Sequence, residues 1–408
     1  MSTYTPESNL TLKHLELDAL LDLTTAINSQ MDEASLLKIY LFTLVANFKI
    51  DCLLMYELEH EKWHCKLRHG LEKSYYPHSE ELIQVLEANN FLNFNDTEFR
   101  TLNSHFDISI PVAKNGKLVA SVLIGSRKKF SEDTEAIKFI QTISNILFVA
   151  IQNTRLTQEK IKQETIKNEL DTARKLQSLL FPQSLPYSDR LKIHATYIPH
   201  QSVGGDYYDY IPLPTGDFMV CIADVSGKGI SAAFIMSNFQ AALRVLARQG
   251  LRMEDIVNEL NTLVYNNTKG EKFVTFFIAK YIPRKNMIVY VNCGHNPPIL
   301  VSAQHQIEFL EKGSVILGVF PTLPSIETGK VYNVSESVLL AYTDGLVESF
   351  EKTDTDLGIE VIKKILLENT DINMLHSHIL NAMNLGDDAF DDITMLSCFF
   401  SNEELAID

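Results

Sequence analysis

Cysteine is scarce in this chain, and neither a long apolar run nor a basic cluster occurs in it. The five cysteines are scattered among 408 residues without a Cys-x-x-Cys pair. Such an odd number without metal-binding spacing is typical of reduced, structural thiols in the cytoplasm. The chain begins MSTYTPESNLTLKH, which lacks the basic segment and apolar run of a signal peptide. No stretch approaches the roughly 18 to 20 apolar residues of a membrane-spanning helix. The sequence therefore predicts a cytoplasmic protein without a membrane segment.

The charge of the chain is strongly acidic. The formal net charge is −16, and no group of lysines and arginines could follow a phosphate backbone, so we expect no nucleic-acid partner. The acidic excess has two interpretations, a solvated surface or carboxylates gathered around a metal. Hydrophobic residues make up 45% and charged residues 22% of the chain, as in folded proteins, and its length suits two domains of about 150 to 220 residues each.

Residues 1–152 show alternating helix and strand patterns. Apolar residues recur at helical spacing in 36–45, and 51–59 is typical of a strand. The segment 106–126 places Asn115-Gly116 between two apolar, β-prone runs, which predicts a tight hairpin. A helix is then expected to open at Ser131 and to continue through Ile151.

This order of helix, strands, hairpin and closing helix resembles a GAF domain, and we expect residues 1–152 to form an α/β sensor domain of that kind. A PAS domain is the alternative. A haem or metal site is one interpretation of the histidines in this region, and exposed loop histidines are the other. Cys65 has the same two interpretations, a reactive site or simple packing. The residues in question are His60, His64, His69 and His78.

Residues 153–186 are predicted to form a helical linker. The segment 153–181 contains no glycine or proline and is rich in Glu, Lys and Gln, which favours a continuous helix. A heptad seam is weak, since Glu159, Gln163 and Gln177 interrupt it. We expect a polar-interrupted coiled coil that forms a homodimer, or else a single amphipathic helix packed on its own domain. The apolar seam residues are Leu156, Ile166, Leu170, Ala173 and Leu180.

Residues 187–402 are expected to form an α+β domain in which helices cover sheets. Strand patterns are punctuated by Gly, Asp and Asn, and a few helical segments are inserted among them. The expected strands are 191–199, 217–226, 272–283, 287–294, 299–303 and 337–344, and the expected helices are about 230–248, 253–267, 358–369 and 372–384.

Aspartates stand at strand ends and turns in this second domain. Asp206 follows two glycines, Asp224 and Asp344 each end an apolar strand, and Asp391-Asp392 precede the last one. An isolated Asp-Gly is usually only a turn. Two carboxylates about 4 Å apart repel by about 4 kcal/mol at an effective dielectric near 20, so a cluster needs cations or protons. All-oxygen donors favour Mg²⁺ or Mn²⁺. Spacing alone does not show whether these side chains converge.

Six motifs of this domain resemble, in order, those of the SpoIIE-type branch of the PPM (type 2C) protein phosphatases. The preceding ARKLQSLLFP (173–182) resembles the helix that leads into that domain. The six motifs are VGGDYYD (203–209), ADVSGKGISAAFIMS (223–237), NCGHNPPIL (292–300), GSVILG (313–318), YTDGLVES (342–349) and DDITML (391–396).

The resemblance implies an αββα sandwich that holds two divalent cations, Mn²⁺ or Mg²⁺. By the same resemblance Asp224 bridges the two metals, with the backbone carbonyl of Val225 beside it. Asp206 binds one metal directly or through water, and Asp344 and Asp391 are further ligands. All of these residues are present, so we expect an active enzyme in which these aspartates are the catalytic residues.

The resemblance also implies the reaction and the partners. A metal-bound water attacks phosphoserine or phosphothreonine directly, and the sequence lacks a Cys-x5-Arg phosphatase loop. The implied substrate is a phosphorylated anti-sigma-factor antagonist with a STAS fold. We expect the GAF-like domain to regulate the phosphatase through the linker and the helices of 230–267. Asp209 and Asp392 are expected in second-shell or outer-metal roles, and His295 as a structural residue or a general acid.

Other interpretations explain less of the sequence. Gly204-Gly205-Asp206 is similar to the signature of diguanylate cyclases, but Tyr207-Tyr208 replaces its Glu-Phe. Ser226-Gly227-Lys228-Gly229 lacks the upstream glycine and final Ser/Thr of a phosphate-binding loop, so Lys228 is expected near the substrate or on the surface. An inactive, phosphatase-like scaffold is the non-enzymatic alternative.

Overall fold

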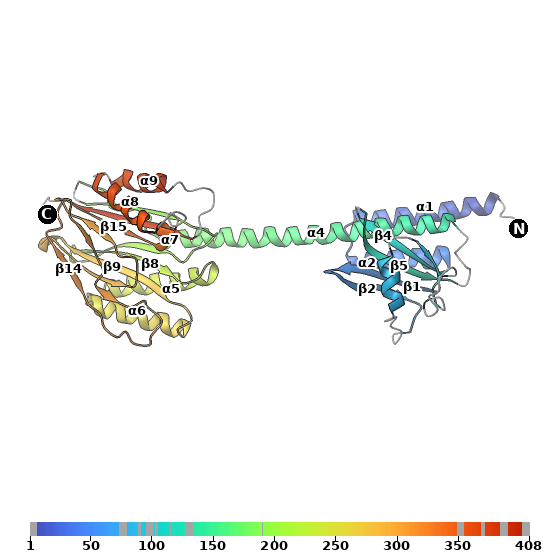
Figure 1. Ribbon diagram of the computed structural model, residues 1–408, viewed down its shortest axis with the longest axis horizontal. Helices are drawn as coiled ribbons and strands as arrows, with labels where there is room; N and C mark the ends of the chain where they lie inside the picture. Colours follow the sequence, from blue (N-terminus) through green and yellow to red (C-terminus); the bar gives the residue numbers. More distant parts are fainter. Residues whose placement is uncertain are drawn as a thin grey trace. The chain divides into compact units, whose positions relative to one another are not determined.

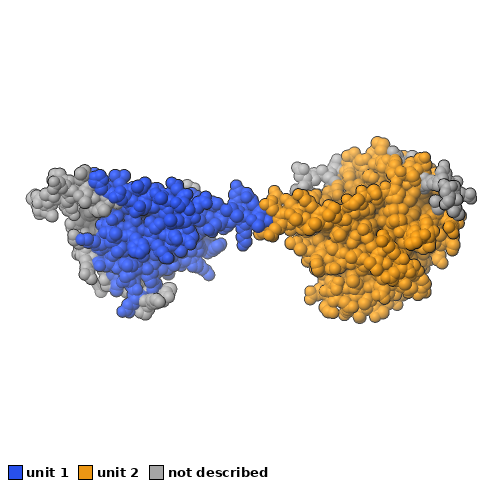
Figure 2. Space-filling model, turned by 180° about the vertical axis from the view of Figure 1, so that it is seen from behind, with its two compact units in different colours: residues 1–165 blue, residues 166–408 orange. Residues whose placement is uncertain are grey.

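The computed structural model divides the chain into two compact units, residues 1–165 and residues 166–408 (Figure 2). Three residues on which predictions depend, His78, Asn115 and Ser131, lie outside the described part. The structure describes residues 6–72, 80–88, 91–94, 102, 105–114, 116–126, 134–189, 191–348, 355–368, 372–383 and 391–401.

The first unit is an antiparallel sheet between helices. Its five strands lie in the order β2-β1-β5-β4-β3. Gly116 has a φ of +77° between β4 and β5, which pair antiparallel with Lys114 opposite Lys117, so the predicted hairpin is confirmed. The elements are α1 (Pro6–Asn28), α2 (Glu33–Phe48), β1 (Cys52–Glu59), β2 (Lys62–His69), α3 (Glu80–Glu87), β3 (Leu92–Asn93), β4 (Ile108–Lys114), β5 (Lys117–Gly125) and the first part of α4 (Thr134–Ser178).

Strand β1 is buried on both faces, which explains its almost unbroken apolar sequence. Leu53 and Met55 belong to the core shared with α1, α2 and α4. Leu54 and Tyr56 alternate with them and belong to a second core that includes residues of α3. Successive side chains of a strand point to opposite faces, so a strand covered twice needs apolar residues at every position. The GAF-like assignment of this unit stays a prediction.

The second unit is a four-layer αββα sandwich, which confirms the expected α+β class (Figure 1). One sheet has the order β13-β10-β9-β8-β7 with β14 beside β10, and the other has the order β12-β11-β15-β16-β6. The strands are β6 (Leu191–Ile198), β7 (Tyr207–Pro212), β8 (Phe218–Val225), β9 (Val274–Ile282), β10 (Met287–Cys293), β11 (Ile299–Val301), β12 (Ile307–Phe309), β13 (Gly313–Ser314), β14 (Gly329–Tyr332), β15 (Ser337–Tyr342) and β16 (Ile393–Phe400).

Helices cover both outer faces of the sandwich. Val220 and Ile222 of β8 pack between the two sheets, whereas Met219 and Cys221 of the same strand pack under α5 and α6. A third core lies between the other sheet and α7 to α9. The helices are α5 (Ile230–Ala247), α6 (Met253–Thr268), the 3-10 turn η3 (Pro283–Lys285), α7 (Asp344–Glu348), α8 (Thr355–Glu368) and α9 (Ile372–Ala382).

Helix α4 joins two segments that the sequence analysis treats separately. The expected helices of 131–151 and 153–181 are one helix, Thr134–Ser178, because no glycine or proline interrupts them. Helices α4 and α5 each contain an 18-residue window apolar enough to cross a membrane by length and composition. Core helices of soluble proteins pass the same test, and 50% of the window in α4 and 33% of that in α5 are buried.

Candidate metal centre

Asp206 lies at the start of β7 and is buried, with only 1% of its surface exposed. Its Oδ2 accepts hydrogen bonds from the hydroxyl of Thr343, at 2.9 Å, and from the hydroxyl of Thr394. Burial raises its pKa well above the ordinary range, and the neighbouring charge of Asp224 adds to the rise. The two threonines therefore fix the direction of a carboxylate that is costly to ionise.

Asp224 is the last residue but one of strand β8, and its side chain lies next to that of Asp206. The two carboxyl groups are hydrogen-bonded to each other, and burial raises the pKa of Asp224 to about 7. The charges of Asp344 and then Asp391 contribute to this rise. The other three predicted ligands therefore all act on the Asp224 carboxyl group, Asp206 through a hydrogen bond and Asp344 and Asp391 through their charges.

Asp344 and Asp391 lie on the other sheet's side of this cluster. Asp344 begins α7, and burial followed by the charge of Asp391 raises its pKa. Asp391 Oδ1 accepts a hydrogen bond from the backbone N–H of Asp392, and its Oδ2 lies 2.8 Å from Nζ of Lys228. Lys228 therefore neutralises one of the four carboxylates.

Asp392 holds the glycine loop against this cluster. Its carboxylate accepts hydrogen bonds from the backbone N–H groups of His200, at 2.8 Å, and Gly205, at 3.0 Å. A Cβ on Gly204 would lie 2.0 Å from Asp392 Oδ2, and one on Gly205 would lie 2.7 Å from the carbonyl oxygen of Val225. Both positions need glycine because the backbone passes so close to these oxygens.

The glycine loop is also bonded to helix α4. The buried Gln177 donates from Nε2 to the carbonyl of Gly204 at 2.8 Å, and its Oε1 accepts from the N–H of Gly204 at 3.3 Å. Gln240 of α5 donates to the carbonyl of Leu180 at 3.0 Å. The sequence analysis treats Gln177 only as a polar interruption of a coiled-coil seam.

Asp209 belongs to a separate buried network. Arg244 of α5 donates to its two carboxylate oxygens, from Nε at 2.7 Å and from Nη2 at 3.0 Å, and the hydroxyl of Tyr207 donates to it as well. Asp209 is fully buried. This pairing fastens α5 to β7, so Asp209 supports the domain's structure through Arg244.

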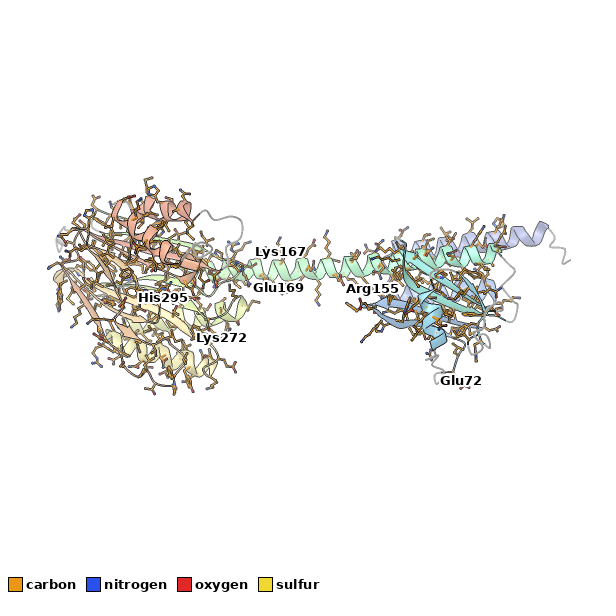
Figure 3. All side chains as sticks on the ribbon, in the orientation of Figure 1. Glu72, Arg155, Lys167, Glu169, Lys272 and His295 are labelled. Carbon is orange, nitrogen blue, oxygen red and sulfur yellow. The ribbon has the colours of Figure 1, made fainter. Side chains whose placement is uncertain are left out.

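His295, labelled in Figure 3, is buried and lies just after strand β10. The backbone N–H of His295 donates to Asn292 Oδ1 at 2.8 Å, and its ring Nδ1 lies 2.9 Å from the hydroxyl of Thr275. Burial lowers its pKa to about 4, so the ring is neutral at physiological pH. A neutral, enclosed imidazole suits a structural role better than proton donation to a substrate.

The chemistry of this cluster suits hard divalent cations. All of its possible metal ligands are oxygens. The pKa values of Asp206, Asp224 and Asp344 are raised, as expected for carboxylates without a neutralising cation nearby. The hydroxyl of Tyr197 has no hydrogen-bond partner among the described residues, although the charges of Asp392 and Asp206 act on it. Such a buried, unpaired hydroxyl fits a site that takes up further polar groups.

The described side chains do not form a complete set of metal ligands. No three His, Cys, Asp or Glu side chains in the part of the chain covered by the structure are gathered so that they could hold an ion. Asp206 is engaged by its two threonines and Asp391 by Lys228. A cation that took up Asp391 would have to displace Lys228.

Sequence reasoning missed the residues that support the aspartates. Thr343 and Thr394 both stand inside the quoted motifs, next to the acids, but spacing does not show that their hydroxyls meet at Asp206. Tyr197 and Arg244 lie outside the acidic motifs altogether. Only the pairing of β15 with β16 brings the two threonines together, because Thr343 N–H bonds to the carbonyl of Thr394 just beyond that ladder.

Residues 214–400 match the sequence pattern of the family described as Stage II sporulation protein E (SpoIIE). This part of the chain is similar to the SpoIIE family. The SpoIIE match includes Asp224, Asp344 and Asp391, whereas Asp206 precedes it. The resemblance to this family is therefore confirmed for the second unit.

Two curated relatives share this SpoIIE region. The chain is 29% identical over 187 residues to the phosphoserine phosphatase RsbU of Bacillus subtilis, which covers 46% of the chain and 55% of RsbU. It is 26% identical over 186 residues to the phosphoserine phosphatase RsbP of the same organism, which covers 45% of the chain and 46% of RsbP. The chain thus spans about half the length of these relatives.

A solved structure supports the fold of the SpoIIE region. The SiaA-PP2C domain of Pseudomonas aeruginosa aligns with a TM-score of 0.51 and 16% identity, over 59% of this chain and 99% of that domain. At this identity the likeness concerns the fold, and it agrees with the αββα sandwich.

Proposed function

We propose that this protein is a cytoplasmic, divalent-metal-dependent phosphatase that hydrolyses phosphoserine or phosphothreonine on a protein substrate. The observation that carries the proposal is the group of interacting carboxylates around the buried Asp206 in a SpoIIE-type domain. Two relatives of this domain bear the name phosphoserine phosphatase. The raised pKa values of Asp206, Asp224 and Asp344 supply the physical reason for a cation at this place.

The proposed ligands are the four aspartates and one carbonyl. Asp224 would bridge two cations, Mn²⁺ or Mg²⁺, with the carbonyl of Val225 beside it. Asp206 would hold one cation, and Asp344 with Asp391 the other. A bound pair of such cations supplies an ionised water at neutral pH and stabilises the oxygens of an in-line phosphoryl displacement.

The chain's own residues prepare this site. Thr343 and Thr394 orient the carboxylate of Asp206, and Asp392 holds the glycine loop in place. A thiolate nucleophile is disfavoured, because burial raises the pKa of all five cysteines, that of Cys293 to about 12. Direct attack by water is therefore the mechanism we propose.

Regulation by the first unit is part of the proposal. We propose that residues 1–152 form a GAF-like sensor, that 153–186 form the linker, and that 187–402 form the phosphatase. The bonds of Gln177 to Gly204 give the linker helix a direct route to the loop of Asp206. The exposure of Leu156 and Ile166 on α4, 57% and 48%, suits a homodimer through this helix. The proposed substrate is an anti-sigma-factor antagonist with a STAS fold.

Metal-dependent hydrolysis tests the function. The full chain with Mn²⁺ should hydrolyse p-nitrophenyl phosphate and a phosphoserine peptide, and EDTA should abolish the reaction. Asp224→Asn should lower kcat/KM at least about 100-fold, because the bridging ligand of both cations is changed. Asp255→Asn is the matched control, since the Asp255 side chain on α6 is 40% exposed and pairs with Arg252. An inert wild-type protein, or full activity in Asp224→Asn, would favour the inactive scaffold instead.

A further inference from the structure

A pocket of about 840 Å³ opens beside the carboxylate cluster. Its walls come from Leu170 and Arg174 of α4, from the segment 199–203 that precedes the glycine pair, and from the segment 228–231 that opens α5. All of these residues belong to the second unit. The volume lies at the upper end of the range for ligand pockets, about 300–1,000 Å³, and far exceeds that of a phosphoryl group.

The inner end of this pocket is the rim of the candidate metal centre. Lys228 lines the pocket, and its Nζ lies 2.8 Å from Asp391 Oδ2. His200 also lines it and donates its backbone N–H to Asp392 at 2.8 Å. The pocket therefore adjoins the residues that would surround a phosphoryl group bound at the centre.

The pocket has a charge opposite to that of the chain as a whole. Arg174, His200 and Lys228 line it, and none of its lining residues is acidic, although the net charge of the protein is −16. Arg174 is exposed, and it makes no ion pair with another residue of the described part of the chain. Its charge acts on Tyr197, whose hydroxyl lies near Asp392 and Asp206. A cationic wall next to an acidic centre suits an anionic polypeptide.

We propose that this pocket seats the segment of the protein substrate around the phosphorylated residue, and that Arg174 pairs with acidic side chains that flank it. The inference rests on the proposed phosphatase function and adds a substrate class to it, phosphosegments with acidic neighbours. Arg174 also makes helix α4 a part of the substrate site. Leu170, half-buried one turn earlier on the same helix, offers an apolar contact to the same segment.

Steady-state kinetics of full-length variants test the assignment. The substrates are a phosphoserine peptide flanked by Asp and Glu, the same peptide flanked by Ala, and p-nitrophenyl phosphate. Arg174→Gln should raise KM for the acidic peptide about three- to fivefold, as expected for one exposed ion pair, with a smaller effect on the other two substrates. Arg174→Lys should recover part of the loss. Lys175→Gln, an exposed neighbour outside the pocket, is the control.

The outcomes separate this inference from the function on which it rests. For each protein, the KM for the acidic peptide is divided by the KM for the alanine-flanked peptide. If this ratio is the same in wild type and in Arg174→Gln, the role of Arg174 is overturned, although hydrolysis continues. Should the wild type hydrolyse none of the substrates, the proposed function fails, and fluorescence anisotropy of the acidic peptide still decides the inference. Weaker peptide binding in Arg174→Gln than in Lys175→Gln supports it, and equal binding overturns it.

Discussion

The four aspartates of the candidate metal centre repel one another, and the surrounding residues offset part of that repulsion. Two threonine hydroxyls bond to Asp206, and Lys228 pairs with Asp391. Burial, and then the charges of Asp344 and Asp391, raise the pKa of Asp224 to about 7. A cation would therefore stabilise the carboxylate of the residue that we propose as the bridge.

Lys228 competes with a cation for Asp391. Lys228→Met should free this carboxylate and tighten Mn²⁺ binding about two- to fivefold, the range for a pair in which the side chains are 42% and 34% exposed. Isothermal titration calorimetry on the full chain measures the change. Lys285→Met, an exposed lysine in the turn after β9, is the control. Weaker Mn²⁺ binding in Lys228→Met would contradict competition.

At the scale of elements, one buried ion pair fastens helix α5 to strand β7. Arg244→Met should destabilise the second unit by about 2–4 kcal/mol, because Asp209 would stay buried without its partner. This loss of stability is smaller than that for a fully buried pair, because the Arg244 side chain is 37% exposed.

Hydrogen exchange of the α5 amides measures this loss of stability. The double variant Asp209→Asn/Arg244→Met removes the unpaired charge and should recover part of the loss. Equal protection of the α5 amides in wild type and Arg244→Met would show that the pair does not hold the helix.

Helix α9 is joined to two strands by His376. The ring nitrogens lie 2.8 Å from the hydroxyl of Thr196 in β6 and 2.7 Å from that of Ser397 in β16. Burial, and then the charge of His194, lowers the pKa of His376 to about 3. The unfolded chain takes up a proton near pH 6.5 and the folded chain does not, so stability falls as the pH drops from 6.5 toward 3.

This histidine predicts an acid-sensitive domain. Between pH 7 and pH 4.5 the free energy of unfolding of the second unit should fall by about 2–3 kcal/mol through His376. In His376→Gln the free energy of unfolding should fall less between pH 7 and pH 4.5, by that same amount. This difference does not depend on how much the substitution destabilises the domain at pH 7. Hydrogen exchange of the β6 and β16 amides at both pH values measures it. An identical fall in wild type and variant would contradict this role.

The periodicity of apolar residues predicted the strands and helices of the sandwich better than it predicted which residues contact one another. Strands such as β8 and β9 carry apolar residues on both faces, and α5 and α6 begin and end within a few residues of the expected positions. β7 and β14 were not predicted, since β7 is short and contains Asp209 and Pro212, and β14 has four residues. Asp209 and Arg244 are 35 residues apart, and no spacing rule joins residues on different elements.

At the scale of the whole molecule, one helix contributes to both units. Arg155 of α4 (Figure 3) pairs with Glu33 at 2.6 Å and Glu57 at 2.9 Å in the first unit. Gln177 of the same helix bonds to Gly204 in the second unit. A rotation of the helix at one end would therefore act on the glycine loop at the other.

Insertions in the exposed part of α4 test this coupling. Two alanines between Lys162 and Gln163 rotate everything beyond them by about 200°, whereas seven residues rotate it by only about −20°. The two-residue insertion should change kcat/KM several-fold, and the seven-residue insertion should leave it near the wild-type value. Equal kinetics in both insertions and wild type would contradict signalling through helix rotation.

The central claim is that aspartates far apart in the sequence hold a pair of divalent cations. Anomalous scattering from crystals of the full chain grown with Mn²⁺ tests it most directly. We expect two peaks about 3.5–4 Å apart, bridged by Asp224, with Asp206 on one side and Asp344 and Asp391 on the other. No peak at these residues, or Mn²⁺ bound only elsewhere, would contradict it.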